Sequence, residues 1–142
     1  MNTREGFDEA QRFGLERSIA VVGLLAAVAL ILGMALHRLA VDDAFITYRY
    51  ALNLATGKGF TYNPGQPVLS TTSPLYALLL AAGAWLWADA ERLPGLANTI
   101  STVAIWLGGV LLFVLGRREE APWPGALAGL LYIVHPLLWL NL

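Results

Sequence analysis

Two adjacent carboxylates, Asp42 and Asp43, and the guanidinium of Arg49 are the side chains in this sequence best placed to do chemistry. They follow a long apolar run, so they stand where a membrane-spanning segment would leave the membrane. A carboxylate at the edge of a low-dielectric cavity can act as a general base toward a hydroxyl. A pair of carboxylates can instead hold a divalent cation through oxygen ligands. Arg49 could bind a phosphate or orient one of the carboxylates.

The simpler interpretation of either aspartate is a helix N-cap, which is worth about 1 kcal/mol. One carboxylate is enough for a cap, whereas two adjacent carboxylates repel each other. Successive residues of a helix lie about 100° apart, so the pair cannot face one ligand from regular helical positions. We therefore expect one aspartate to cap the helix and the other to point into a cavity. In a non-enzymatic alternative, such as an assembly subunit or a degenerate fragment, both only cap and bind water.

The composition indicates a membrane protein. Of the 142 residues, 57% are hydrophobic and 13% are charged, whereas a soluble domain carries about 25% charged residues. The net charge of −1 argues against a nucleic-acid partner. The sequence has no cysteine, which excludes disulfides and thiolate metal sites.

Apolar runs predict membrane helices along the chain. The run 19–36 contains no charged residue and would span about 27 Å as a helix, close to the hydrocarbon thickness of about 30 Å. The run 74–88 is short, whereas 96–116 is long enough to cross. The last run, 125–142, is predicted as a transmembrane helix that the chain end truncates. A charged corner precedes it, made of Arg117, Arg118, Glu119 and Glu120.

The distribution of arginines predicts the orientation. Residues 1–18 form a polar tail, expected to be partly disordered or a short helix. Its arginines precede the first span closely, so the positive-inside rule places the N-terminus in the cytoplasm of a multi-pass plasma-membrane protein. If all apolar runs cross, Arg117 and Arg118 lie outside, against that rule. If the run 74–88 is re-entrant or interfacial, they lie inside, and we favour this arrangement.

Residues 37–73 form a polar segment that we expect on the outer face. Apolar residues recur in it at steps of four, three, four and three, which predicts an amphipathic helix on the membrane surface. Gly57 predicts the end of that helix, and residues 63–66 predict a type II turn between two short extended pieces. Ser73-Pro74 predicts the start of the next helix. The apolar stripe consists of Val41, Phe45, Tyr48, Leu52 and Ala55, and the opposite face of Asp42, Arg49, Asn53 and Thr56.

The order of these pieces resembles the first outer loop of the lipid-linked-sugar glycosyltransferases of the GT-C superfamily. The shared pattern is an acidic pair after the first span, an R-Y-A-x-N-L-x-x-G-x-G helix, an N-P-G turn and T-S-P-L opening the next helix. All four pieces are present in order within residues 42–76. The most similar members are relatives of the aminoarabinose and mannosyl transferases and of the mycobacterial arabinofuranosyltransferases. The resemblance covers residues 19–142 and implies an all-α integral membrane protein that contains the N-terminal helices of a GT-C-type bundle.

The resemblance also implies an activity. A sugar would move from a polyprenyl-phosphate donor to a hydroxyl acceptor on a glycan, a lipid or a protein, at the outer face of the bilayer and with inversion. Asp42 would be catalytic with Asp43 as its neighbour, and no cofactor is implied beyond a divalent cation that this pair could hold. Many relatives carry a lysine where this chain has Ser73, so the phosphate contact would fall to Arg49, Lys58 or residues beyond 142. The expected substrate-binding residues are Arg49, Tyr50, Lys58, Thr72 and Ser73.

Family members are several hundred residues long, so the resemblance implies that this chain is a fragment. A transporter is the third class of function, and we rank it last. Intramembrane charges usually mark the path of a transported ion or substrate. The apolar runs here contain no acidic or basic residue apart from His135.

Overall fold

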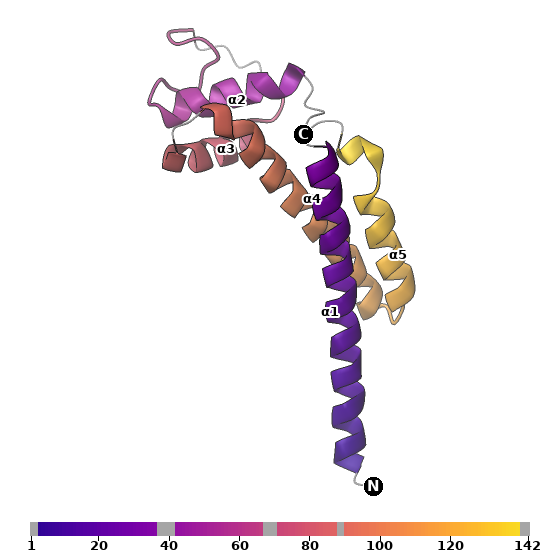
Figure 1. Ribbon diagram of the computed structural model, residues 1–142. Coiled ribbons are helices and arrows are strands. Elements are labelled where there is room, and N and C mark those ends of the chain that lie inside the picture. The colour runs from indigo at the N-terminus through magenta and orange to yellow at the C-terminus, as the bar shows by residue number, and fades with distance from the viewer. Residues whose placement is uncertain (1–2, 37–41, 67–70, 88–89, 140–142) are drawn as a thin grey trace. The chain divides into compact units, whose positions relative to one another are not determined.

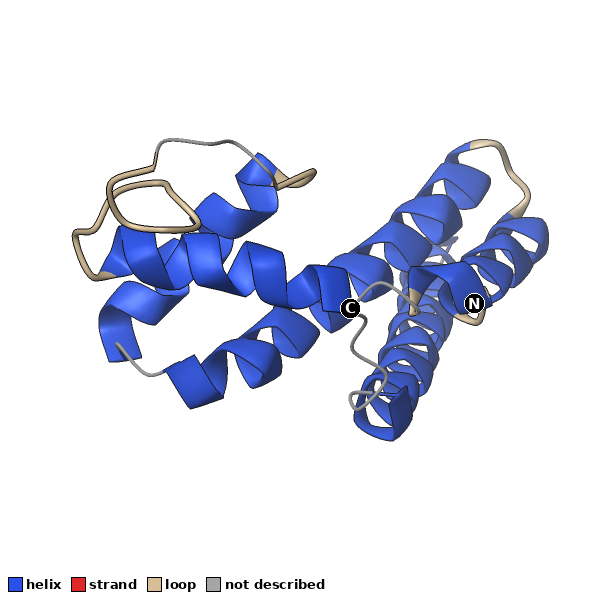
Figure 2. Cartoon of the chain, turned by 90° about the horizontal axis from the view of Figure 1, so that it is seen from above, coloured by secondary structure: helices blue, strands red, loops and turns tan. Residues whose placement is uncertain are grey.

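The computed structural model describes residues 3–36, 42–66, 71–87 and 90–139, without the side chains of 3–13, 42–43, 87 and 90. Its secondary structure is helical and contains no strand within these ranges, which confirms the predicted all-α class (Figures 1 and 2). Two 3-10 turns, η1 (Ala90–Arg92) and η2 (Pro136–Leu138), accompany the α-helices. The α-helices are α1 (Thr3–Leu36), α2 (Asp42–Ala55), α3 (Pro74–Trp87), α4 (Leu93–Arg118) and α5 (Pro122–Ile133).

Two of the described helices are long and apolar enough to cross a membrane. They are Gly14–Leu36 within α1, with 23 residues, and α4, with 26 residues. The predicted runs 19–36 and 96–116 lie inside them. The polar tail differs from the expectation, because α1 continues through it as one helix from Thr3. Glutamate and arginine in the tail have high helix propensities, so a helix there needs no apolar face.

The chain divides into two compact units, which are described separately. Unit 1 comprises Met1–Leu32 and Val103–His135, and unit 2 comprises Gly33–Thr102 and Pro136–Leu142.

Glycines bring α5 against α4 in unit 1. A Cβ atom added to Gly125 would lie 2.8 Å from the Cα of Gly116, and one added to Gly129 would lie 2.5 Å from the carbonyl oxygen of Gly109. The two helices run antiparallel, because the later glycine of α5 meets the earlier glycine of α4 (Figure 1). Small residues allow membrane helices to approach this closely. The Gly125-x-x-x-Gly129 spacing is the sequence signal that would have predicted this close approach of the two helices.

The predicted final helix, 125–142, is shorter in the structure. α5 ends at Ile133 and has 12 residues, a length of about 18 Å. Pro136 has no N–H and disfavours a helical conformation of His135, so the helix cannot continue through them. The N–H of His135 instead donates to the carbonyl oxygen of Tyr132 at 3.1 Å, and the 3-10 turn η2 follows.

Helices α2 and α3 lie side by side in unit 2 (Figures 1 and 2). Tyr48 and Ala51 of α2 are buried against α3, and the start of α4 completes this core. α3 begins at Pro74, as predicted, and the carbonyl oxygen of Ser73 accepts the N–H of Ala77 at 3.0 Å. The other buried members of this core are Leu80, Ala81, Ala84, Leu93 and Ala97.

Candidate functional site

The predicted acidic pair occupies the first two positions of α2. The side chains of Asp42 and Asp43 lie outside the described part of the structure, which gives only their helical positions. Residues four and seven positions apart share one side of a helix. The position of Asp42 therefore shares a side with Arg49. The position of Asp43 shares a side with Thr47 and Tyr50.

The predicted faces of α2 are only partly correct. Of the apolar stripe, Tyr48 is buried and Phe45 is 55% exposed, which suits a stripe that faces either the bundle or lipid, but Asn53, predicted on the polar face, is 3% exposed. Val41 lies outside the described residues. The difference arises because α2 is covered on two sides, by α3 and by the segment 59–62, so its buried face is wider than one stripe.

The segment after α2 folds as predicted at Gly57 and Gly65. Gly57 has a φ of 76°, and the N–H of Lys58 donates to the carbonyl oxygen of Asn53 at 2.8 Å, which forms a Schellman cap. Gly65 has a φ of 86°, and the N–H of Gln66 donates to the carbonyl oxygen of Asn63 at 3.0 Å, as a type II turn requires. An isolated bridge joins Asn63 and Gln66. The second predicted extended piece falls mostly on residues 67–70, outside the described residues.

Asn53 attaches this segment to α2. Its amide Nδ2 donates to the carbonyl oxygens of Thr61 and Tyr62, at 2.8 Å and 2.9 Å. Beside it, the ring of Tyr50 is 5.0 Å from that of Phe60, centroid to centroid. Tyr50 is fully buried, so in this conformation it shapes the loop and presents no surface to a substrate. This burial does not support the prediction that Tyr50 contacts the substrate directly.

A second link joins α2 to the turn before α3. The hydroxyl oxygens of Thr47 and Thr71 are both buried and lie 3.4 Å apart. Thr71 Oγ1 also accepts the N–H of Ser73 at 3.3 Å. The predicted binding residues Thr72 and Ser73, both exposed, are thus held beside the first half of α2, where the acidic pair lies.

Lys58 is not part of the same cluster. It follows the C-terminal end of α2, whereas the acidic pair begins that helix, and 14 helical residues span about 21 Å. Arg49 is exposed on the same side of α2 as the position of Asp42. The structure therefore links Thr72 and Ser73 to the first half of α2 through Thr47, whereas Arg49 lies near the middle of α2, about 200° around the helix from Thr47. Lys58 lies beyond the other end of α2. The linking roles of Thr47, Asn53 and Thr71 were not predicted, because no local pattern in the sequence distinguishes them from other polar residues of a helix or a loop.

The pKa of Tyr48, on α2, is shifted from its ordinary value. Burial raises the pKa of Tyr48, and the nearby Tyr76 raises it further, so the phenol stays neutral well above physiological pH. No group of three or more acidic, histidine or cysteine side chains gathers among the described residues. The divalent-cation hypothesis depends on Asp42 and Asp43, and it stays a prediction.

Comparisons with known proteins give one informative similarity. No family model matches the chain, and no solved structure matches it. It is 34% identical over 100 residues to a terminal β-(1→2)-arabinofuranosyltransferase of Mycobacterium tuberculosis, a match that covers 69% of this chain. The chain spans 16% of the length of that relative. A distant relative of this chain is therefore a glycosyltransferase.

Proposed function

We propose that this chain forms the N-terminal part of a membrane glycosyltransferase of GT-C type that uses a polyprenyl-phosphate sugar. Asp42 acts as general base: it takes the proton of an acceptor hydroxyl, whose oxygen attacks the anomeric carbon. The bond from that carbon to the phosphate oxygen breaks on the opposite side, so the configuration inverts and the polyprenyl phosphate leaves with the bonding electrons. Arg49 lies on the same side of α2 and is suited to the phosphate charge.

The contact between Thr47 and Thr71 is the structural observation that most supports this proposal. The Thr47–Thr71 contact holds the Thr72-Ser73 turn against the acidic half of α2. The turn that opens α3 thereby lies beside the half of α2 that begins with the acidic pair, and α2 is distinct from the two long apolar helices. The similarity to an arabinofuranosyltransferase supports sugar transfer as the chemistry of that place.

A membrane topology belongs to the proposal. In unit 1, Arg117 Nη1 donates to Ser18 Oγ at 2.7 Å, so the C-terminal end of α4 and the start of the apolar part of α1 lie together. Because arginines favour the cytoplasmic side, we place both there. Helices α1 and α4 then cross and α2 faces outward. α3, with 14 residues, is about 21 Å long and does not cross a core of about 30 Å.

The test is transfer of radiolabelled sugar in membranes that contain the protein. Polyprenyl-phosphate arabinofuranose is the first donor to try, because of the named relative. Loss of a general base lowers a rate by about 10²- to 10⁴-fold, and we expect Asp42→Asn to show a loss of this size. Glu119→Gln, an exposed carboxylate at the α4–α5 corner, is the matched control and should keep full activity.

Membrane insertion of each variant is checked by resistance to alkaline extraction. Normal transfer by Asp42→Asn would refute the assigned base, and loss in Asp43→Asn alone would move that role to Asp43. The test is made on the protein that contains this chain as its N-terminal part, and normal transfer by both aspartate variants would show that the two aspartates only cap α2.

A further inference from the structure

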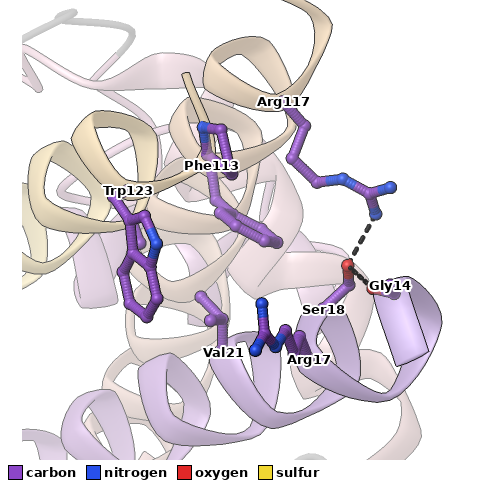
Figure 3. A pocket seen from close by; sticks show the side chains of 9 residues that line it. Gly14, Arg17, Ser18, Val21, Phe113, Arg117 and Trp123 are labelled. Carbon is purple, nitrogen blue, oxygen red and sulfur yellow. Dashed lines mark hydrogen bonds between the residues drawn. The ribbon is translucent and has the colours of Figure 1, made fainter. Parts of the chain in front are cut away.

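A hollow at one end of unit 1 has a lining that takes no part in the proposed sugar transfer. Its volume is about 260 Å³, and it lies between α1, the end of α4 and the beginning of α5 (Figure 3). It is built from charged residues on one side and from apolar residues on the other. The lining consists of Gly14, Arg17, Ser18, Val21, Phe113, Arg117, Pro122, Trp123 and Ala126.

The polar side of the hollow is organised around Arg117. Its Nη1 donates to Ser18 Oγ at 2.7 Å, and Ser18 Oγ donates in turn to the carbonyl oxygen of Gly14, also at 2.7 Å (Figure 3). Arg117 is thus positioned by a neutral hydroxyl, which uses one of the five donors of the guanidinium and leaves its charge in place. Arg17 adds a second guanidinium to the lining. The planar fork of a guanidinium matches the geometry of a phosphate group.

The apolar side of the hollow fits a hydrocarbon chain. Val21 and Phe113 form its wall, and Trp123 stands at its edge with 73% of its surface exposed. Tryptophan is enriched where the hydrocarbon core of a bilayer meets the headgroups. Leu15 and Ile19, next to the hollow on α1, are 59% and 62% exposed. A free phosphate ion would contact only the arginines, whereas a phospholipid would contact the arginines with its headgroup and the apolar wall with an acyl chain.

We propose that this hollow binds one anionic phospholipid, with its phosphate on Arg117 and Arg17 and an acyl chain against Val21, Phe113 and Trp123. The hollow lies at the ends of the two helices able to cross a membrane, so the lipid comes from the leaflet at that end. The site shares no residue with the acidic end of α2 and does not depend on sugar transfer.

Native mass spectrometry of the purified full chain in detergent, titrated with phosphatidylglycerol, tests the site. Phosphatidylcholine is the neutral comparison, and inorganic phosphate, matched in ionic strength with chloride, is the competitor. We expect one phosphatidylglycerol bound in preference to phosphatidylcholine. Binding should weaken about fivefold in Arg117→Gln and in Arg17→Gln, the loss expected for one basic side chain near an anionic lipid.

Arg118→Gln removes an arginine next in sequence to Arg117 but outside the lining, so it should bind as the wild type does. Helix content measured by circular dichroism shows that each variant is folded, and Trp123→Ala tests the apolar wall without changing the charge. Equal binding of both lipids, or unchanged binding in both arginine variants, overturns the proposal. Displacement of the lipid by inorganic phosphate beyond the chloride effect overturns the assignment to a lipid.

Discussion

The hydroxyl oxygens of Thr47 and Thr71 lie 3.4 Å apart although 24 residues separate them in the sequence. Both side chains are buried, so the pair connects the acidic half of α2 to the turn that opens α3. This contact decides which exposed residues of the turn lie beside the first half of α2.

Thr71→Val should uncouple the turn from α2 without changing the shape of the side chain. An intramolecular hydrogen bond contributes about 1 kcal/mol, so we expect the free energy of unfolding to fall by about that amount. The double variant with Thr47→Val should lose less than the sum of the two single variants, because either single variant already removes the Thr47–Thr71 contact. A double-mutant cycle from thermal melts in detergent measures this coupling. Additive effects would show that the two hydroxyls do not interact.

Asn53→Asp should release the segment 57–66 from α2. The amide now donates to two carbonyl oxygens, whereas a carboxylate can only accept and would face them unpaired, at a loss of about 1–3 kcal/mol or more. Limited proteolysis with a protease that cleaves after Lys58 should become faster. Asn63→Asp, at an exposed position of the same segment, is the control. Unchanged cleavage in Asn53→Asp would mean that the aromatic contacts hold the segment alone.

Gly116→Val should separate α5 from α4. Its Cβ would lie 2.5 Å from the Cα of Gly125, a backbone atom that cannot give way. We expect a loss of about 3 kcal/mol or more, at the upper end of overpacking effects. Cross-linking between cysteines placed at Leu112 and Ala128 would report the separation. Gly23→Ala, which meets nothing within 4 Å, should keep the two helices together and leave stability unchanged or slightly higher.

Glu120→Gly should stabilise the chain. Glu120 closes α4 with a φ of 56°, in a Schellman cap where the N–H of Ala121 donates to the carbonyl oxygen of Gly116 at 2.8 Å. A left-handed conformation costs a residue with a side chain about 1 kcal/mol, and glycine avoids that strain. The reciprocal change, Gly57→Ala at a φ of 76°, should destabilise by a similar amount. Thermal melts of the two variants should therefore shift in opposite directions, and shifts of the same sign would contradict the cap assignment.

The topology is tested by labelling single cysteines, since the natural sequence has none. Arg118→Cys should react with a membrane-impermeant maleimide only from the cytoplasmic side, and Lys58→Cys only from the outside. Both positions are exposed in the structure, so poor reaction reflects the membrane and not burial. Labelling of both from the same side would refute the proposed pair of crossings by α1 and α4.

Backbone chemistry made some features of this fold predictable. Glycine accepts a positive φ and proline favours the first helical turn, so Gly57, Gly65 and Pro74 could be assigned from their neighbours in the sequence. Features that depend on distant segments were not predictable in this way. Asn53 looked solvent-exposed because periodicity treats every polar residue alike, whereas its amide is buried against a loop eight residues further on. Phe45 was assigned to the apolar stripe, and periodicity alone does not say whether such a residue packs against another helix or is exposed, as Phe45 is.

The candidate site also combines features that the sequence predicts with features that it does not. The positions of the acidic pair and the turn could be predicted, but not which polar residues meet. Lys58 appeared close to Asp42 along the sequence, yet the length of α2 separates them. Thr71 looked like part of a loop, and only its partner on α2 reveals that it links the two segments.

The hydrogen bond between Arg117 and Ser18 has a consequence for biogenesis. In the proposed topology both residues stay on the cytoplasmic side, so the insertion machinery would export the whole of segment 37–92 before the second long helix enters the bilayer. The contacts that order this exported segment, from Asn53 to Tyr62 and from Thr47 to Thr71, are made within it. Helix α2 and its loop can therefore assemble as soon as they emerge, while the ribosome is still synthesising the residues that follow α4.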